Sequence, residues 1–326
     1  MSTLAHNEAP ALSVDHHLVL KALLSTAATY PLDANGWIAV RGEDRERWLN
    51  GMLTNNIRDL KPGEGCYNFL LSAQGRIQQD TTAFQLGGQI LLETAHERVP
   101  ALMAALDHFI IMDDVELEDV SARHHGIGIA GPEAEAKLAA IGIDVAGLEP
   151  VSTREAEWKG AKLWVVAQYS PLTPRFELWA EEMAPLTAAL ADVPQASATD
   201  LESLRILEGV PAIGHDIREK ELAQETGQIR ALHFSKGCYL GQEIVERIRS
   251  RGNVHRTFTG FLFQGTAPVT GTAIIAAGLP VGELTSIDAT LGAALGFIRR
   301  EALERGQELS YEGGTLIASP LPFRIA

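Results

Sequence analysis

The sequence predicts an α+β protein that ends in a small β-barrel or sandwich. Before residue 257, runs with apolar residues at helical spacing alternate with β-prone runs bounded by turn residues. From 257 onward, short β-prone runs are punctuated by glycine, and only helices of up to about two turns fit between them. The 326-residue chain is long enough for about two domains.

The first predicted element is an amphipathic helix near the N-terminus. Leu18, Leu20, Leu23 and Leu24 share one helical face. A signal peptide needs a cationic lead-in and an unbroken apolar segment, whereas Lys21 interrupts this one. Since no stretch approaches the length of a membrane span, the sequence predicts a cytoplasmic protein without a membrane partner.

A mixed α and β region is predicted next. The run 36–42 reads as a short strand, and 43–57 reads as a helix with charge in its first turn. Two glycine-containing turns divide 66–94 into a meander of three strands. A helix around 96–109 and a strand at 115–121 complete this region.

The segment from Gly126 to Gly131 spells G-x-G-x-x-G, which is also the pattern of dinucleotide-binding loops. In those loops the glycines follow a strand and form the turn that opens a helix. Here 126–129 read as the strand itself, and Pro132 suits the first position of the next helix. A plain strand–turn–helix is therefore preferred over a nucleotide site.

The remaining elements before the barrel follow from the same patterns. Strands are predicted at 162–168 and 175–180, and helices near 181–191 and at 199–211. A further helix is predicted to begin near Gly241, because apolar residues recur behind it at helical spacing.

Charge and cysteine content narrow the function. The formal net charge of −15 argues against a protein that coats nucleic acid or a membrane surface by bulk charge. Cys66 and Cys238 are too few for a disulfide framework or for a four-thiolate metal or cluster site. No metal site is predicted.

Residues 236–243, KGCYLGQE, resemble the signature K-G-C-(Y/F)-x-G-Q-E of the folate-binding YgfZ family. This family is related to the glycine cleavage T protein, an aminomethyltransferase, and supports iron–sulfur cluster assembly or repair. The segments WLNGMLTNNI, LLSAQGRIQQD, RILEGVPAIGHDI and VGELTS resemble further family motifs in the expected order, so the resemblance covers nearly the whole chain. The motif residues around Cys238 are Lys236, Gly237, Tyr239, Gly241, Gln242 and Glu243.

The resemblance implies a three-lobed body around a central opening, where tetrahydrofolate or another reduced folate binds. It implies two interleaved α+β lobes in 1–240, the signature helix with an arginine-rich connector in 241–256, and a C-terminal β-barrel in 257–326. The implied function is a tetrahydrofolate-binding accessory protein for assembly or repair of iron–sulfur proteins, rather than a stand-alone catalyst. Its implied partners are a reduced folate and iron–sulfur client or assembly proteins.

Two alternatives stay open. One is a folate-dependent aminomethyl- or methyltransferase that uses Asp80, because the T protein uses an aspartate in this region for transfer at the folate nitrogen. Asp80 ends the matching segment, although Gln79 replaces the preceding acid. The other is an RNA-binding protein linked to tRNA modification, with RNA as the less favoured partner.

The resemblance also implies folate contacts. The glutamate that helps to hold the pterin in the T protein corresponds to Leu207, with the carboxylate moved one place to Glu208. One residue turns a helical side chain by about 100°. Glu208 is therefore the candidate pterin ligand, and Met52 and Tyr67 lie on segments that line the folate opening in the T protein.

Cys238 has two interpretations. It is either a small buried side chain or a functional thiol at the mouth of a helix. Helix N–H groups and neighbouring Lys236 would favour the thiolate, and the resemblance favours the functional interpretation. Cys66 lies inside a predicted strand and is interpreted as structural.

Four arginines follow the motif. Arg247, Arg249, Arg251 and Arg256 are either a solvated face balanced by neighbouring glutamates or an anion-binding patch. The guanidinium fork suits carboxylates and phosphates. We expect Arg249 and Arg251 to hold the anionic end of a polyglutamylated folate, with an RNA phosphate as the alternative anion.

Overall fold

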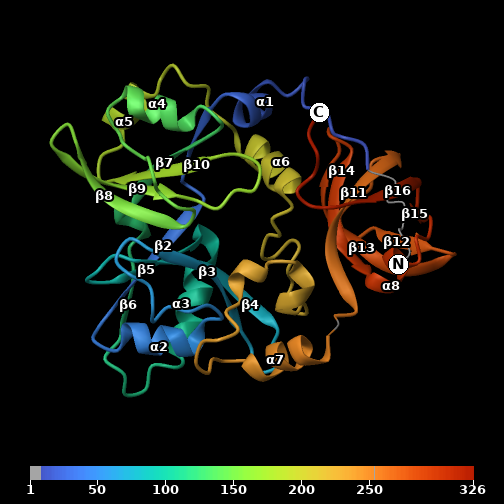
Figure 1. Cartoon of the computed structure of the whole chain (residues 1–326), viewed down its shortest axis with the longest axis horizontal. Helices are drawn as coiled ribbons and strands as arrows, with labels where there is room; N and C mark the ends of the chain where they lie inside the picture. Colours follow the sequence, from blue (N-terminus) through green and yellow to red (C-terminus); the bar gives the residue numbers. More distant parts are fainter. Residues whose placement is uncertain (1–8, 253) are drawn as a thin grey trace.

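The computed structural model describes residues 9–252 and 254–326, which form two five-stranded sheets and a closed barrel. Each belongs to one lobe. The segment 209–241, which joins α6 (Ala198–Glu208) to α7 (Gln242–Arg251) and is called the connector from here on, lies between the three lobes (Figure 1). This arrangement confirms the predicted α+β fold with a C-terminal barrel. Among the described residues, no helix is long and apolar enough to cross a membrane.

The first lobe contains the predicted three-strand meander, with α2 (Arg45–Met52) and α3 (Val99–Asp107) packed on the outer face of its sheet. The order of the strands across the sheet is β3 (Gly65–Leu71), β4 (Ile77–Gln85), β5 (Ile90–Ala95), β2 (Asn35–Arg41) and β6 (Glu116–Asp119). A short 3-10 helix, η1 (His96–Arg98), leads into α3. The helix predicted at 43–57 is shorter than expected, because the chain turns into extended backbone at Leu53.

Leu53 introduces a turn that joins distant segments. The Thr54 hydroxyl donates to the carbonyl of Ala231, and the Asn55 amide donates to the carbonyls of both Tyr67 and Arg230. These bonds satisfy backbone carbonyls of strand β3 and of the segment around residue 230, so the turn fixes the two against each other.

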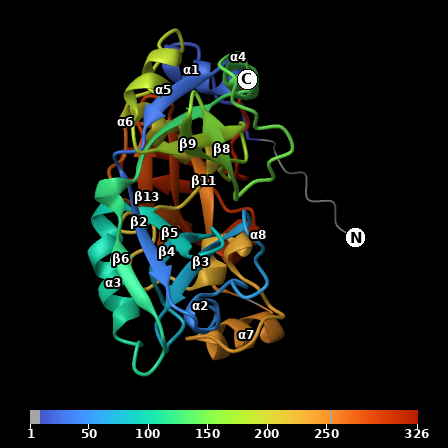
Figure 2. The same cartoon turned by 90° about the vertical axis from the view of Figure 1, so that its left-hand side faces the viewer.

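The second lobe interleaves with the first along the chain. The order of its strands is β1 (Ala28–Pro31), β7 (His125–Ala130), β10 (Arg175–Ala180), β9 (Ala161–Ala167) and β8 (Ser152–Trp158). All five first-lobe strands therefore lie in sequence between β1 and its partner β7. Two helices, α4 (Ala134–Ala140) and α5 (Ala184–Ala189), pack on the outer face, and Figure 2 shows this lobe stacked above the first.

Strand β7 contains Gly126 and Gly128, as predicted when the dinucleotide interpretation was set aside. The ring of Tyr30 lies across Gly128, where a Cβ atom would be 2.0 Å from the ring Cζ. The glycine pattern is therefore a packing requirement. Helix α4 begins at Ala134, two residues later than the predicted start at Pro132.

The C-terminal lobe is a barrel, which decides between the two predicted β architectures. The barrel order is β11 (Arg256–Gly265), β14 (Ala293–Arg299), β13 (Leu279–Asp288), β12 (Ala273–Ala276), β15 (Leu309–Tyr311) and β16 (Gly314–Ser319), with β16 closing on β11. The only described helix in this lobe, α8 (Arg300–Glu304), has five residues. Closure removes the unpaired edges that an open sheet would expose.

Two helices link the lobes. Helix α1 (Leu18–Ser25) buries Leu20 and Leu23 against a core that it shares with α6. A capping box between Ser197 and Asp200 starts α6, and the left-handed Gly209 ends it, so the predicted helix 199–211 stops at Glu208.

Asp216 joins the connector to the barrel. Its carboxylate is fully buried and accepts hydrogen bonds from the Ala212 N–H (2.9 Å), from Arg205 (2.8 Å) and from the Ser286 hydroxyl (2.8 Å). Thr285, also on β13, donates a further hydrogen bond. One buried charge thus ties α6, the connector and the barrel together, and every partner must be in place for that charge to be tolerated.

Candidate functional site

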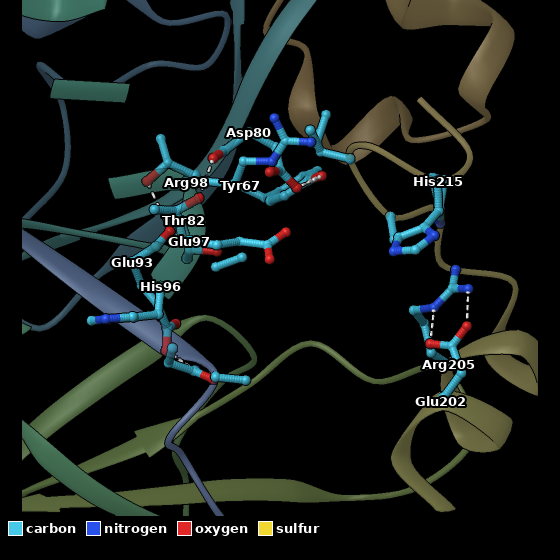
Figure 3. A pocket seen from close by; sticks show the side chains of 18 residues that line it. Tyr67, Asp80, Thr82, Glu93, His96, Glu97, Arg98, Glu202, Arg205 and His215 are labelled. Carbon is cyan, nitrogen blue, oxygen red and sulfur yellow. Dashed lines mark hydrogen bonds and ion pairs between the residues drawn. The ribbon is translucent and has the colours of Figure 1, made fainter. Parts of the chain in front are cut away.

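A cavity of about 720 Å³ lies where the first-lobe sheet faces the end of α6 and the connector (Figure 3). The first-lobe wall carries Tyr67, Asp80, Thr82, Glu93, His96, Glu97 and Arg98, and the opposite wall carries Glu202, Arg205 and His215. The cavity thus brings together two of the residues selected from the sequence, Tyr67 and Asp80.

Tyr67 and Asp80 form a pair on neighbouring strands. The Tyr67 hydroxyl donates to Asp80 Oδ2 at 2.7 Å. Burial raises the pKa of the Asp80 carboxyl, and the Tyr67 bond and the charges of Arg230 and Arg98 partly oppose that rise. A carboxyl in this setting can accept or donate a proton closer to neutral pH than a surface aspartate can.

The guanidinium of Arg230 packs against the ring of Tyr67. It belongs to a single 3-10 turn, η4 (Ile229–Ala231), and its guanidinium carbon lies 4.0 Å from the ring centroids of both Tyr67 and Tyr169. Burial lowers the pKa of Arg230, whereas the two tyrosines and the charges of Asp80 and Glu208 act in the opposite direction. Neither Arg230 nor Tyr169 was predicted from the sequence. The polar pair Thr54–Asn55 in WLNGMLTNNI is the sequence signal nearest to them, because its side chains donate hydrogen bonds to the carbonyls of Ala231 and Arg230 and so hold η4 in place.

Glu208 is buried and receives a hydrogen bond from the Ser170 hydroxyl. Burial raises the pKa of its carboxyl, and Ser170 and Arg175 oppose that rise. Leu207, the position that corresponds to the family's glutamate, is fully buried in the apolar core. The one-residue shift therefore places an apolar side chain in the core and turns the carboxylate toward Ser170 and Arg230.

Two buried glutamates, Glu93 and Glu177, form a carboxylate pair at the junction of the first two lobes. Glu93 accepts hydrogen bonds from Asn35 (2.6 Å) and from Gln168 (2.8 Å), and the same Gln168 amide donates to Glu177 (3.0 Å). Burial, with the nearby charge of Glu177, raises the pKa of Glu93 to about 8. Glu93 was not predicted from the sequence, although a glutamate inside the apolar run ILLET is a signal for a buried carboxylate.

Glu93 is expected to make stability fall as the pH rises. Its folded pKa of about 8 lies above the ordinary value of 4.5, so the folded protein binds more protons between these pH values. The stabilisation is complete below the unfolded pKa and is lost as the pH rises through about 8, by at most about 1.4 kcal/mol per pH unit. Glu93→Gln mimics the protonated carboxyl and should flatten the profile in urea unfolding from pH 5 to pH 9. Glu97→Gln, an exposed change on the same wall, is the control, and parallel profiles for wild type and Glu93→Gln would contradict this role.

The motif runs from the loop before α7 into the first turn of that helix. Cys238 is exposed, whereas Tyr239 is buried. The backbone N–H of Tyr239 donates to Gln242 Oε1 at 3.2 Å. Gly241 has φ 80°, and a Cβ there would lie 2.6 Å from the carbonyl oxygen of Ser72. Gly241 is thus required by its close approach to the β3–β4 turn.

Two other motif residues lie differently. Gly237 faces open space and has no positive φ angle, so neither a close approach nor a left-handed conformation requires glycine at this position. Glu243 is exposed in the first turn of α7, where a negative charge favours the helix N-terminus.

Lys236 was expected to act on Cys238, but its hydrogen bonds go to the carbonyls of Leu53 (2.6 Å) and Asn55. Burial lowers the pKa of Lys236 to about 8, and the thiol that its charge influences is Cys66. Cys66 lies on β3 as predicted, half-buried, and burial raises its pKa to about 11. Lys236 thus braces the Leu53 turn.

Three remaining candidates lie apart from the described residues that line the cavity. Met52 ends α2 and packs against the first-lobe core. Arg249 stacks on Phe234 (4.7 Å) and approaches Glu246 (3.5 Å). Arg251 ends α7, and its side chain lies outside the described part of the chain. A folate-tail role for Arg249 and Arg251 stays a prediction.

Arg256 differs from the other arginines. It forms an ion pair at 2.9 Å with the buried Glu225, at the point where the connector meets the barrel. This arginine is therefore part of the fold.

Comparisons with known proteins agree with the fold. The family model described as the GCVT N-terminal domain matches residues 20–236. The aminomethyltransferase of Thermus thermophilus is 26% identical over 324 residues, which cover 95% of this chain and 90% of that protein. The aminomethyltransferase of Geobacillus kaustophilus is 26% identical over 327 residues, which cover 93% and 88%. The crystal structure of glycine cleavage system aminomethyltransferase T from Bartonella henselae superposes with a TM-score of 0.83 at 21% identity, covering 94% of this chain and 89% of that one.

Proposed function

Since this chain belongs to the GCVT N-terminal domain family, we propose that it binds a reduced folate, tetrahydrofolate, in the cavity between the first lobe and the connector. The observation that carries the proposal is the Tyr67–Asp80 pair on the cavity wall, with Arg230 and Glu208 behind it. The cavity volume of about 720 Å³ lies in the range of small-molecule sites.

The residues present fit the chemistry of a folate. The amino and ring N–H groups of the pterin are donors, which suit the carboxylates of Asp80 and Glu208. The carboxylates of the glutamate tail suit the basic side chains on the cavity walls, where Arg98 lies against Gly214 and His215 lines the wall opposite the first-lobe sheet (Figure 3). When bound, a reduced folate supplies a ring nitrogen that can carry a one-carbon unit.

Folate binding should be measurable by calorimetric titration with tetrahydrofolate. Asp80→Asn is expected to raise the Kd about tenfold, because a buried carboxylate acceptor is replaced by a weaker amide acceptor. Glu208→Gln should weaken binding only if the shifted carboxylate meets the pterin. Glu301→Gln, an exposed change on α8 apart from the residues that line the cavity, is the control and should change the Kd less than about twofold. A flat titration of the wild type at millimolar tetrahydrofolate would refute the proposal.

Within this function, we infer a role as an accessory factor for iron–sulfur proteins, with Cys238 as the reactive group. The exposure of this thiol in the loop before α7 supports the inference, because a thiol must be accessible to meet a partner's cysteine, sulfide or iron. A single cysteine cannot hold a cluster by itself, since clusters take four protein ligands as a rule. Cys238 would therefore supply one ligand to a cluster that is being transferred, or react with a sulfur intermediate on a partner protein.

A folate-dependent aminomethyl- or methyltransferase is the second candidate. The raised pKa of Asp80 and its bond to Tyr67 favour it, because they equip the cavity with a proton-holding group. Turnover of tetrahydrofolate with an aminomethyl donor would support the transferase, whereas binding without turnover would support the accessory role. The RNA alternative predicts copurified material that absorbs at 260 nm and a salt-dependent affinity.

A further inference from the structure

Two tyrosine rings and one guanidinium form a stack beside the cavity. The guanidinium carbon of Arg230 lies 4.0 Å from the centroid of Tyr67, a buried residue, and 4.0 Å from that of Tyr169, which is 39% exposed. The two rings therefore cover a flat group at stacking distance. Tyr67 also lines the cavity, so the covered space adjoins it.

The surroundings of this slot are acidic. Asp80, bonded to the Tyr67 hydroxyl, and Glu208, bonded to Ser170, both act on the charge of Arg230. The Nε of Arg230 donates to Gln228 at 3.1 Å within its own 3-10 turn. The side chain is thus held by two ring faces, two carboxylate charges and one local hydrogen bond.

The group in the slot has a chemical counterpart in the proposed ligand. A guanidinium is a planar N–C–N unit that presents N–H donors along its edge. The 2-amino-4-oxo ring of a pterin contains the same N–C–N donor unit closed into a flat ring. A slot that holds the first between two aromatic faces and near carboxylates therefore matches the second in thickness and donor pattern.

We propose that Arg230 occupies the ring slot between Tyr67 and Tyr169 in the free protein, and that a pterin ring enters only when the Arg230 side chain leaves. This inference rests on the proposed folate function and adds a gate and a specificity filter to it. Only a flat ligand with a guanidine-like edge replaces both the stacking and the donors that Arg230 withdraws. The exit is open toward solvent, because Tyr169 and the neighbouring Ile229 are exposed.

The gate predicts that removing Arg230 strengthens binding. Arg230→Ala should lower the Kd for pterin and for tetrahydrofolate about tenfold, because the ligand no longer displaces two cation–π contacts. Association should also become faster, and Arg230→Lys should give an intermediate Kd. Lys159→Ala, which removes a cation–π contact with Trp158 in the second lobe, is the matched control and should leave the Kd unchanged.

Methylguanidinium provides a test that does not depend on folate. In Arg230→Ala it should bind saturably in calorimetry and compete with pterin, whereas the wild type should not bind it. Arg230→Gln repeats the measurement if the alanine variant fails to fold.

The outcomes separate the two proposals. Pterin binding that is unchanged or weaker in both Arg230→Ala and Arg230→Gln would overturn the gate while leaving folate binding in place. Saturable methylguanidinium binding by Arg230→Ala, without binding of pterin or tetrahydrofolate by any variant, would overturn the proposed function and the gate with it, and leave a guanidinium site. Tighter binding of pterin with faster association would support both.

Discussion

Cys238→Ser is expected to abolish rescue of iron–sulfur enzyme activity in a strain that lacks this protein, with no change in the fold or in folate affinity. The thiol is exposed in the loop before α7, so serine fits without disturbing the core. A hydroxyl replaces the shape of the thiol but neither ligates iron as readily nor attacks sulfur. Activity of cluster enzymes in the complemented strain measures the effect, which should be a loss to the level of the deletion strain.

Cys66→Ser is the matched control. Cys66 is half-buried on β3, where burial raises its pKa to about 11, so a serine should cost about 1 kcal/mol of unfolding free energy through poorer packing and a buried hydroxyl. Its effect on rescue should follow stability alone. Iodoacetamide should modify Cys238 before Cys66 in the native protein, because only the first is exposed. Full complementation by Cys238→Ser would refute the reactive-thiol role and leave KGCYLGQE as a structural turn.

Asp216→Ala is expected to cause the largest loss of stability. The carboxylate is fully buried and accepts hydrogen bonds from the Ala212 N–H, Arg205, Thr285 and Ser286. Its removal leaves the largely buried Arg205 without this partner and frees three further donors. Breaking one side of a buried ion pair costs about 3–5 kcal/mol, so urea unfolding should shift by that amount.

Glu202→Gln is the control for Asp216→Ala, because Glu202 pairs with the same arginine from a position that is 54% exposed. That change should cost less than about 1 kcal/mol. Limited proteolysis should cut Asp216→Ala first between the connector and the barrel. A loss similar to that of Glu202→Gln would show that the barrel docks mainly through the apolar contacts of α6.

Much of the fold could be predicted from local patterns. Turn glycines at Gly75 and Gly87 set the meander, since both adopt positive φ angles that other residues rarely take. Strands β1 and β8 were not predicted, because ATYP is short and ends in proline, and STREAEW carries three charged residues among its seven positions. Their strand state comes from pairing with β7 and β9.

The site could be predicted only in part. Tyr67 and Asp80 lie on neighbouring strands of a local meander, so the resemblance that selected them also brought them together. Arg230 and Tyr169 lie in short irregular segments without a periodic pattern, and they meet Tyr67 only through long-range packing. No local pattern distinguishes an arginine held between two rings from one on the surface.

The sequence by itself determined the type and order of most elements and the β character of the C-terminal lobe, because spacing, turn residues and helix ends act over a few neighbouring positions. The tertiary structure decided that this lobe closes into a barrel and that Cys238 is exposed. The tertiary structure decided which charges are buried and what they contact. Lys236 reaches the carbonyls of Leu53 and Asn55, and Glu208 turns toward Ser170. Burial and its effect on ionisation depend on segments that are distant in the chain, so they are set only when the lobes and the connector pack together.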